Sequence, residues 1–221
     1  MIELQKLSKI YRTDTVETTA LNELDLSITK GSFIAIKGPS GCGKTTLLNI
    51  MGLMDRPSKG ELILSGKKAS GLSEKERNRL RRQSIGFLFQ KFNLISSLTV
   101  FENVELPLLY QKVNASLRKD KVLSMLKQLG LEGRKDHFPH QLSGGQQQRV
   151  GLARCVINDP DLILADEPTG NLDSNNGEEV MKLLANLHHD GRTIVMVTHN
   201  DHYAAFAERI IEMSDGCFVA E

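Results

Sequence analysis

The stretch GPSGCGKTT, residues 38–46, decides which fold this chain adopts. Its first eight residues satisfy the pattern G-x-x-x-x-G-K-[ST]. The apolar run SFIAIKG, residues 32–38, leads into it and predicts a buried strand, and TTLLNIMGLM, residues 45–54, has the apolar spacing of a helix. A strand, a glycine-rich loop and a helix in this order indicate a loop that binds phosphate groups.

The residue types in this loop suit a nucleoside triphosphate. Glycines allow backbone N–H groups to surround the phosphates without a side chain in the way. Lys44 is expected to neutralise the β- and γ-phosphates, and the Thr45 hydroxyl to hold Mg²⁺. Cys42 is expected to contribute its backbone N–H alone. The ordinary alternative, a glycine-rich turn with a surface lysine, does not account for the strand before the loop and the helix after it.

Two carboxylates follow a second apolar run, in LILADE, residues 162–167. Open α/β sheets bind ligands at the carboxyl ends of their strands, which is where this pair is predicted to lie. Asp166 is expected beside Mg²⁺, and Glu167 is expected to polarise a water molecule as a general base. Taken alone, the pair suits a cap of the next element equally well; beside a phosphate loop, the functional interpretation is favoured.

A second candidate anion site lies in LSGGQQQRV, residues 142–150. Ser143 and two glycines lead into a predicted helix, whose unpaired N–H groups and positive dipole end attract an anion. The chain therefore carries two devices for holding phosphate, about a hundred residues apart.

The bulk composition excludes several classes of protein. The 221 residues include 28 Lys and Arg against 27 Asp and Glu, so no overall charge favours nucleic acid as a partner. The three cysteines form no CxxC pair, which argues against a metal site or disulfides. No secretory signal and no apolar run of about 18 residues is visible. We expect a soluble, intracellular chain without direct membrane insertion, so any link to a membrane requires a partner.

Strands alternate with helices at both ends of the chain, which predicts an α/β fold with a parallel sheet. The first thirty residues predict short strands, and the spacing of apolar residues from Lys91 to Arg154 predicts helices. Residues 73–83 begin with the capping-box pair Ser73 and Glu76 and predict a solvated, basic helix. The stretch RIIEMSDGCFVA, residues 209–220, predicts a hairpin with Asp-Gly in its turn.

The combination of GPSGCGKT, LSGGQ, LILADE and a histidine after an apolar strand resembles the nucleotide-binding subunit of ABC transporters, over essentially the whole chain. The resemblance implies a P-loop NTPase (RecA-like) core with an N-terminal antiparallel β-subdomain and an inserted α-helical subdomain. It implies one domain, residues 1–221. Residues 1–90 and 155–221 would form the core with its β-subdomain, and residues 91–154 the helical subdomain that carries LSGGQ.

The same resemblance assigns roles to four further residues. It implies that Tyr11 stacks on adenine, that Gln90 reaches Mg²⁺ and the attacking water, and that Asp173 signals between subunits. It also implies that His199 contacts the γ-phosphate and supports Glu167. Each has an ordinary alternative: a half-buried strand aromatic for Tyr11, turn residues for Gln90 and Asp173, and a histidine at a strand end for His199.

The full set of expected site residues falls into three groups. The expected catalytic residues are Lys44, Gln90, Glu167 and His199. The expected nucleotide-binding residues are Tyr11, Gly38, Pro39, Ser40, Gly41, Cys42, Gly43, Lys44, Thr45, Thr46, Ser143, Gly144, Gly145, Gln146 and Asp173. The expected ligands of Mg²⁺ are Thr45, Gln90 and Asp166.

The resemblance also explains why the chain has two candidate phosphate-binding sites. ABC ATPases pair head to tail, so Ser143 and Gly145 would hold the γ-phosphate of ATP bound by the loop of a second copy. The implied cofactors are ATP and Mg²⁺. The implied partners are that second copy and an integral-membrane permease, which would place the chain on the cytoplasmic face of the cell membrane. No nucleic-acid partner is implied.

Finer resemblance narrows the branch of the family. SIGFLFQKFNLISSLTVFENVELPLLY, residues 84–110, and EPTGNLDS, residues 167–174, resemble the MacB, LolD and FtsE branch, whose permeases act mechanically on substrates outside the cytoplasm. We expect a stand-alone subunit whose permease is a separate chain, docked around residues 89–101. A regulatory ATPase of the FtsE kind, controlling assembly with little transport, uses the same residues and stays open. An ABC protein acting on ribosomes or DNA is disfavoured, since neither paired cassettes nor long coiled coils are present. The transported substrate and the direction of transport are not determined.

Overall fold

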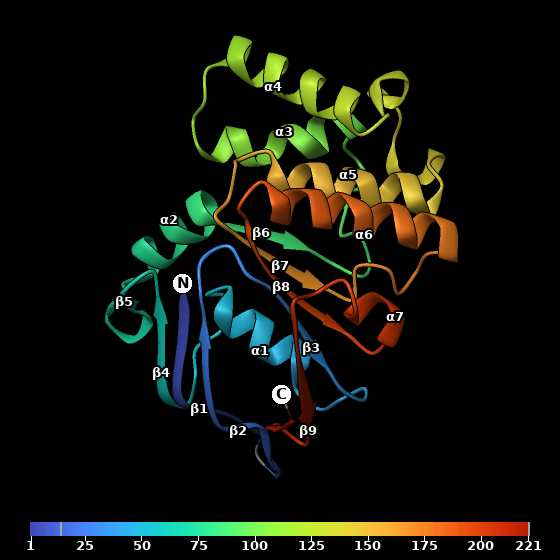
Figure 1. Cartoon of the computed structure of the whole chain (residues 1–221). Helices are drawn as coiled ribbons and strands as arrows, with labels where there is room; N and C mark the ends of the chain where they lie inside the picture. The colour runs from blue at the N-terminus through green and yellow to red at the C-terminus, as the bar shows by residue number, and fades with distance from the viewer. Residues whose placement is uncertain (14, 221) are drawn as a thin grey trace.

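The computed structural model describes residues 1–13 and 15–220, in which helices pack around two sheets (Figure 1). The smaller sheet is antiparallel and has the strand order β2-β1-β4-β5. Its strands are β1 (Ile2–Arg12), β2 (Glu17–Ile28), β4 (Lys59–Leu64) and β5 (Lys67–Lys68).

The first thirty residues form two long strands, so the prediction of short strands was wrong there. Strands β1 and β2 contain 11 and 12 residues. The alternation is interrupted because Lys6 and Glu23 take positive φ values of 45° and 46°, and the pairing of β1 with β2 shifts register near them. Such bulges let a strand continue while its alternation of apolar and polar residues breaks.

The larger sheet has the strand order β10-β9-β3-β8-β7-β6, and all its pairs are parallel except β9 with β10. The parallel strands are β3 (Phe33–Lys37), β6 (Ile85–Leu88), β7 (Leu162–Asp166), β8 (Thr193–Thr198) and β9 (Arg209–Ser214). The antiparallel edge strand is β10 (Cys217–Ala220). Asp215 and Gly216 join β9 to β10 with φ values of 46° and 78°, so the predicted hairpin is confirmed.

Seven α-helices are assigned in the described residues, with three short 3₁₀ turns between them. The α-helices are α1 (Lys44–Met51), α2 (Glu74–Ser84), α3 (Val100–Tyr110), α4 (Ala115–Gln128), α5 (Gly144–Val156), α6 (Ser174–His189) and α7 (Asp201–Ala204). The 3₁₀ turns are η1 (Ala69–Gly71), η2 (Glu132–Arg134) and η3 (Pro139–Gln141). The capping box predicted for α2 is present, with Ser73 accepting from the Glu76 N–H. None of the helices in the described part of the chain has the length and apolar character needed to cross a membrane.

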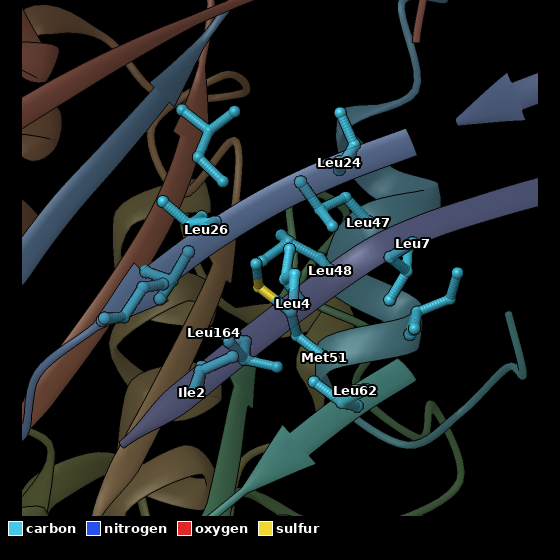
Figure 2. Packing of buried hydrophobic residues seen from close by; sticks show 14 of the residues in the cluster. Ile2, Leu4, Leu7, Leu24, Leu26, Leu47, Leu48, Met51, Leu62 and Leu164 are labelled. Atoms are coloured by element: carbon cyan, nitrogen blue, oxygen red, sulfur yellow. The ribbon is translucent and has the colours of Figure 1, made fainter. Parts of the chain in front are cut away.

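Helix α1 packs between the two sheets and carries the phosphate loop at its N-terminus. Figure 2 shows its Leu47, Leu48 and Met51 among residues of β1, β2, β4 and β7. Leu47 and Met51 are fully buried, as is Leu164 of β7. Burial of this kind stabilises the fold by about 1.5–3 kcal/mol per large side chain. Because α1 packs against both sheets, these contacts fix where the phosphate loop at its start lies.

Helices α5 and α6 cover the opposite face of the larger sheet, and α3 and α4 lie beyond α5 (Figure 1). Helix α5 contributes Leu152 to the core under the sheet and Val150 to the core of the helical group. It therefore joins both groups, and the boundary predicted between residues 154 and 155 falls inside α5. The division of the domain into lobes stays a prediction.

Candidate active site

A pocket of about 690 Å³ opens at the carboxyl ends of β3, β7 and β8. It is lined by Thr18, Thr19, Ala20, Ser40, Gly41, Gly43, Lys44, Thr45, Thr46, Gln90, Asp166, Glu167, His199, Asp215 and Gly216. The loop after β3, the carboxylates after β7 and the histidine after β8 meet there because these three strands are neighbours in the sheet. The pocket thus unites all of the catalytic and metal-binding candidates chosen from the sequence.

The phosphate loop requires glycine where it approaches other backbone. A Cβ added to Gly38 would lie 2.1 Å from the Met213 carbonyl oxygen, and one added to Gly43 would lie 2.4 Å from the Ala20 carbonyl oxygen. Gly43 also has φ of 107°, a conformation that other residues rarely adopt. The loop is consequently pressed against β2 and β9, which sets its shape.

Lys44 lies within the curve of this loop. Its Nζ donates to the carbonyl oxygens of Gly38 at 2.7 Å and Pro39 at 2.8 Å, and only 8% of the residue is exposed. The ammonium charge is therefore held at the centre of the loop beside the start of α1, where anions bind favourably. Cys42 is buried, with Sγ 3.9 Å from Lys44 Nζ, and its side chain does not line the pocket.

Thr45 and Asp166 form a pair of oxygen donors on the floor of the pocket. The Thr45 hydroxyl lies 3.2 Å from each carboxylate oxygen of Asp166. Burial, together with the nearby charge of Glu167, raises the pKa of Asp166, against the opposing effect of the Thr45 hydrogen bond and of Lys44. Mg²⁺ is usually held in proteins by one or two carboxylates together with substrate phosphates. A hydroxyl, a carboxylate and space for phosphates suit that ion.

Glu167 occupies a constrained position next to Asp166. Its φ is 46°, its N–H donates to the Val197 carbonyl at 3.0 Å, and its Oε1 lies 2.8 Å from His199 Nδ1. The Glu167 side chain is 13% exposed and that of His199 is 65% exposed. An αL conformation at a non-glycine residue costs of order 1 kcal/mol, and such strain is concentrated at functional sites. The turn aims the carboxylate into the pocket.

Gln90 enters the pocket from the residues after β6. A Cβ on Gly170 would lie 2.7 Å from Gln90 Nε2, and Asn171 Nδ2 donates to the Gln90 carbonyl oxygen at 2.8 Å. The segment that follows Glu167 therefore supports the segment that carries Gln90. Gln90 lines the same pocket as Thr45 and Asp166.

The LSGGQ residues do not line this pocket. Ser143 is exposed and caps α5, accepting from the Gln146 N–H at 3.3 Å, while Gln146 Oε1 accepts from the Ser143 N–H at 3.0 Å. Asp173 likewise caps α6 by accepting from the Asn176 N–H at 3.0 Å, and hydrogen bonds from Asn176 lower the pKa of this carboxyl. Neither Ser143–Gln146 nor Asp173 is brought to the chain's own phosphate loop.

Tyr11 also stands outside the lining of the pocket. Its hydroxyl donates to Asp55 Oδ2 at 2.9 Å, the Lys9 ammonium lies 4.9 Å from its ring centroid, and the residue is 43% exposed. Burial and the Asp55 carboxylate raise the pKa of Tyr11. The ring is thus fixed at the end of β1 while part of it stays accessible.

Five lining residues were not expected from the sequence: Thr18, Thr19, Ala20, Asp215 and Gly216. They meet because Gly216 N–H donates to the Cys42 carbonyl and its own carbonyl accepts from Asn22, each near 3.0 Å. The hairpin turn was predicted, but no local pattern indicates that it supports a loop some 170 residues earlier. This contact exists only in the tertiary structure.

Comparison with known proteins now decides the family. A family model described as ABC transporter matches residues 21–170. The chain belongs to the ABC transporter family. The predicted fold class, a P-loop NTPase core with an antiparallel β-subdomain and helices, is confirmed by the same kinship.

Similar proteins extend over the whole chain. An uncharacterized ABC transporter ATP-binding protein of Methanocaldococcus jannaschii is 49% identical over 98% of this chain and 96% of its own length. The macrolide export ATP-binding/permease protein MacB of a Shewanella species is 46% identical over 100% of this chain but only 34% of its own length. The chain thus spans about a third of the MacB relatives that it matches.

A solved structure shares this fold. The ATP-binding cassette MJ0796, described as a dimer in a post-hydrolysis state bound to ADP and Pi, has a TM-score of 0.92 and 45% identity, covering 99% of this chain and 96% of that one. This ABC cassette is therefore an ATPase that binds ATP. The roles of individual residues remain predictions.

Proposed function

We propose that this ABC ATPase works as a head-to-tail dimer that drives an integral-membrane permease. One observation carries the proposal: the phosphate loop, Asp166, Glu167 and His199 form one pocket, whereas the capped N-terminus at Ser143 lies apart from it. A helix N-terminus flanked by two glycines and capped by an exposed serine suits a phosphate supplied by another molecule.

Within one pocket, the residues divide the work. Lys44 would hold the β- and γ-phosphates, and Thr45 and Asp166 with Gln90 would hold Mg²⁺. Glu167 would take a proton from the water that attacks the γ-phosphorus, while the bond from that phosphorus to ADP breaks and ADP and phosphate are released. Mg²⁺ supplies positive charge that neutralises the phosphate oxygens. His199, 2.8 Å from Glu167, orients the base and contacts the γ-phosphate.

A second copy completes the site. Its Ser143, Gly145 and Gln146 would donate to the γ-phosphate, while Asp173 would lie near the opposite pocket and Tyr11 would stack on adenine. Closure supplies donors where charge develops and excludes water. The γ-phosphate would link the two copies, so its loss on hydrolysis lets the dimer open. That opening would move the permease. The dimeric state described for the cassette MJ0796 supports this arrangement.

The membrane partner is a permease, with this chain on its cytoplasmic face. Support comes from the MacB relatives, whose name combines ATP binding with a permease, and from cbiO1 of Clostridium perfringens, described as part of the transporter complex cbiONQ. The cbiO1 structure is 30% identical with a TM-score of 0.86 and covers 99% of this chain and 86% of that one. The 46% identity to MacB, compared with 30% to cbiO1, supports a mechanical or export system of the MacB and LolD kind.

Size-exclusion chromatography of the Glu167→Gln variant, with and without Mg-ATP, tests the dimer. The variant replaces the carboxylate with an amide of the same size that can still form hydrogen bonds but cannot act as a base, so we expect ATP binding, no turnover and a shift to dimer. Adding Ser143→Ala should abolish that shift. Ser73→Ala is the matched control, because Ser73 caps α2 with the same capping box but lies on a different helix. A monomer under every condition, despite tight ATP binding, would refute the two-grip arrangement.

A further inference from the structure

Gln148 is a polar side chain in the interior of the protein that no step above uses. It lies one turn after the start of α5 and is 0% exposed. Its Nε2 donates to the carbonyl oxygen of Pro168, the residue that follows Glu167. Helix α5, whose N-terminus is the second candidate phosphate-binding site, is thereby joined to the turn that carries the proposed base, Glu167.

The turn after β7 is fixed at several points. The Glu167 N–H donates to Val197 and its carbonyl accepts from the Gly170 N–H, both at 3.0 Å. Pro168 is buried, so its carbonyl cannot reach water, and Gln148 satisfies it. Since Glu167 is held at a φ of 46°, the strained turn depends on neighbours that over-determine it.

Fold stability does not account for the choice of glutamine. Within the described residues, Gln148 Oε1 has no hydrogen-bond partner, and a buried unpaired amide oxygen costs free energy. An apolar side chain of the same length would remove that penalty but would leave the Pro168 carbonyl unpaired instead, so the two choices differ little in fold stability. We therefore attribute the choice of an amide to its one hydrogen bond, which it donates to the Pro168 carbonyl next to Glu167.

We propose that Gln148 is a positioning residue for ATP hydrolysis, which holds the Glu167–Pro168 turn against the signature helix so that the base meets the attacking water. The proposal rests on the role of Glu167 given above. Gln148 is not among the residues that line the pocket, so it acts through the backbone. Its loss should reduce kcat and leave ATP binding intact.

Gln148→Met in the full chain removes the donor and keeps the volume. Because small misplacements of a catalytic group are costly, we expect kcat to fall by roughly tenfold to a hundredfold, with KM and the thermal midpoint nearly unchanged. Gln147→Met is the matched control: its amide donates to the Leu142 carbonyl at 3.2 Å, away from Glu167, and we expect kcat within about twofold of wild type.

Gln148→Glu adds a readout that a purely structural role would not move. A buried carboxyl group has a raised pKa, and its neutral form can donate to the Pro168 carbonyl as the amide does. The ratio of its kcat to that of wild type should therefore rise as the pH falls from about 8 to about 6.

Three results would overturn the proposal. They are wild-type kcat in Gln148→Met, a loss of kcat matched by an equal loss of ATP-binding sites or folded protein, and a pH-independent ratio for Gln148→Glu. The Glu167→Gln variant distinguishes a failure of the proposed role of Glu167 as the base from a failure of the proposed role of Gln148. If it hydrolyses ATP normally, the proposed base is wrong; if it is inactive while Gln148→Met is fully active, only the positioning role fails.

Discussion

Replacement of Gly145 by alanine should destabilise this cassette through one identifiable contact. A Cβ at Gly145 would lie 1.9 Å from Asn176 Oδ1, 2.4 Å from its Cγ and 3.0 Å from its Cβ. The amide cannot simply rotate away, because Asn176 Nδ2 donates to Asp173 Oδ2 at 2.7 Å. Contact distances would therefore have to grow by at least about 1 Å, which separates the N-termini of α5 and α6.

The expected magnitude follows from two opposing effects. Overpacking of this size costs about 1–3 kcal/mol of the free energy of unfolding. Alanine is favoured over glycine in a helix by up to about 1 kcal/mol, and less in the first turn. We therefore expect Gly145→Ala to lower the free energy of unfolding by about 1–2 kcal/mol, which is a fall in Tm of roughly 2–8 °C for a chain of this size.

A double-mutant cycle isolates the contact. Asn176→Ala removes the two nearest atoms, so Gly145→Ala in that background should be neutral or stabilising by up to about 1 kcal/mol. Urea unfolding of the four proteins, followed by circular dichroism, measures the coupling, which we expect to be about 1–3 kcal/mol. Equal costs of Gly145→Ala in both backgrounds would show that Asn176 is not the obstacle.

Four further substitutions have defined outcomes. Leu164→Ala opens a cavity between α1 and the sheet and should lower the free energy of unfolding by about 2–5 kcal/mol in urea titrations, and a smaller loss would mean that α1 collapses onto the space. Because burial raises the pKa of Asp166, the folded protein loses stability as pH rises from the ordinary carboxyl pKa through the raised one. Nucleotide-free Asp166→Asn should therefore melt above wild type at neutral pH, with the difference vanishing in acid, and a pH-independent difference would contradict this cause. Ser143→Ala should cost about 0.5–2 kcal/mol through its lost cap, and Ser73→Ala a similar amount, measured by thermal unfolding; a much larger cost at Ser143 would mean that its hydroxyl has a further structural role.

The sequence predicted the parts of the site that depend on local pattern. The phosphate loop, the carboxylates after LILA and the histidine after VMVT each follow an apolar strand, and parallel strands end at one edge of a sheet. That rule sufficed to expect Lys44, Asp166 and Glu167 close together. The Asp-Gly turn was also predictable from a local pattern, because both residues favour the positive φ values that a tight hairpin requires.

Other features escaped local patterns because they depend on contacts between distant segments. The bulges at Lys6 and Glu23 break the alternation from which strand length is inferred. The glutamine at position 148 looks like any polar residue on a helix, and only its burial against Pro168 distinguishes it. Periodicity cannot show which face of α5 meets which partner, since α5 packs on two cores.

By itself, the sequence predicted phosphate binding at residues 38–46, ATP hydrolysis and a second phosphate-binding site at LSGGQ, since each motif is a short run whose chemistry is local. Only the tertiary structure decided which of the predicted site residues share a pocket. It places Thr45 against Asp166 across 121 residues and leaves Ser143 elsewhere. The physical reason is the strand order: β3, β8 and β7 are adjacent, so their carboxyl ends converge, whereas α5 crosses the opposite face of the sheet.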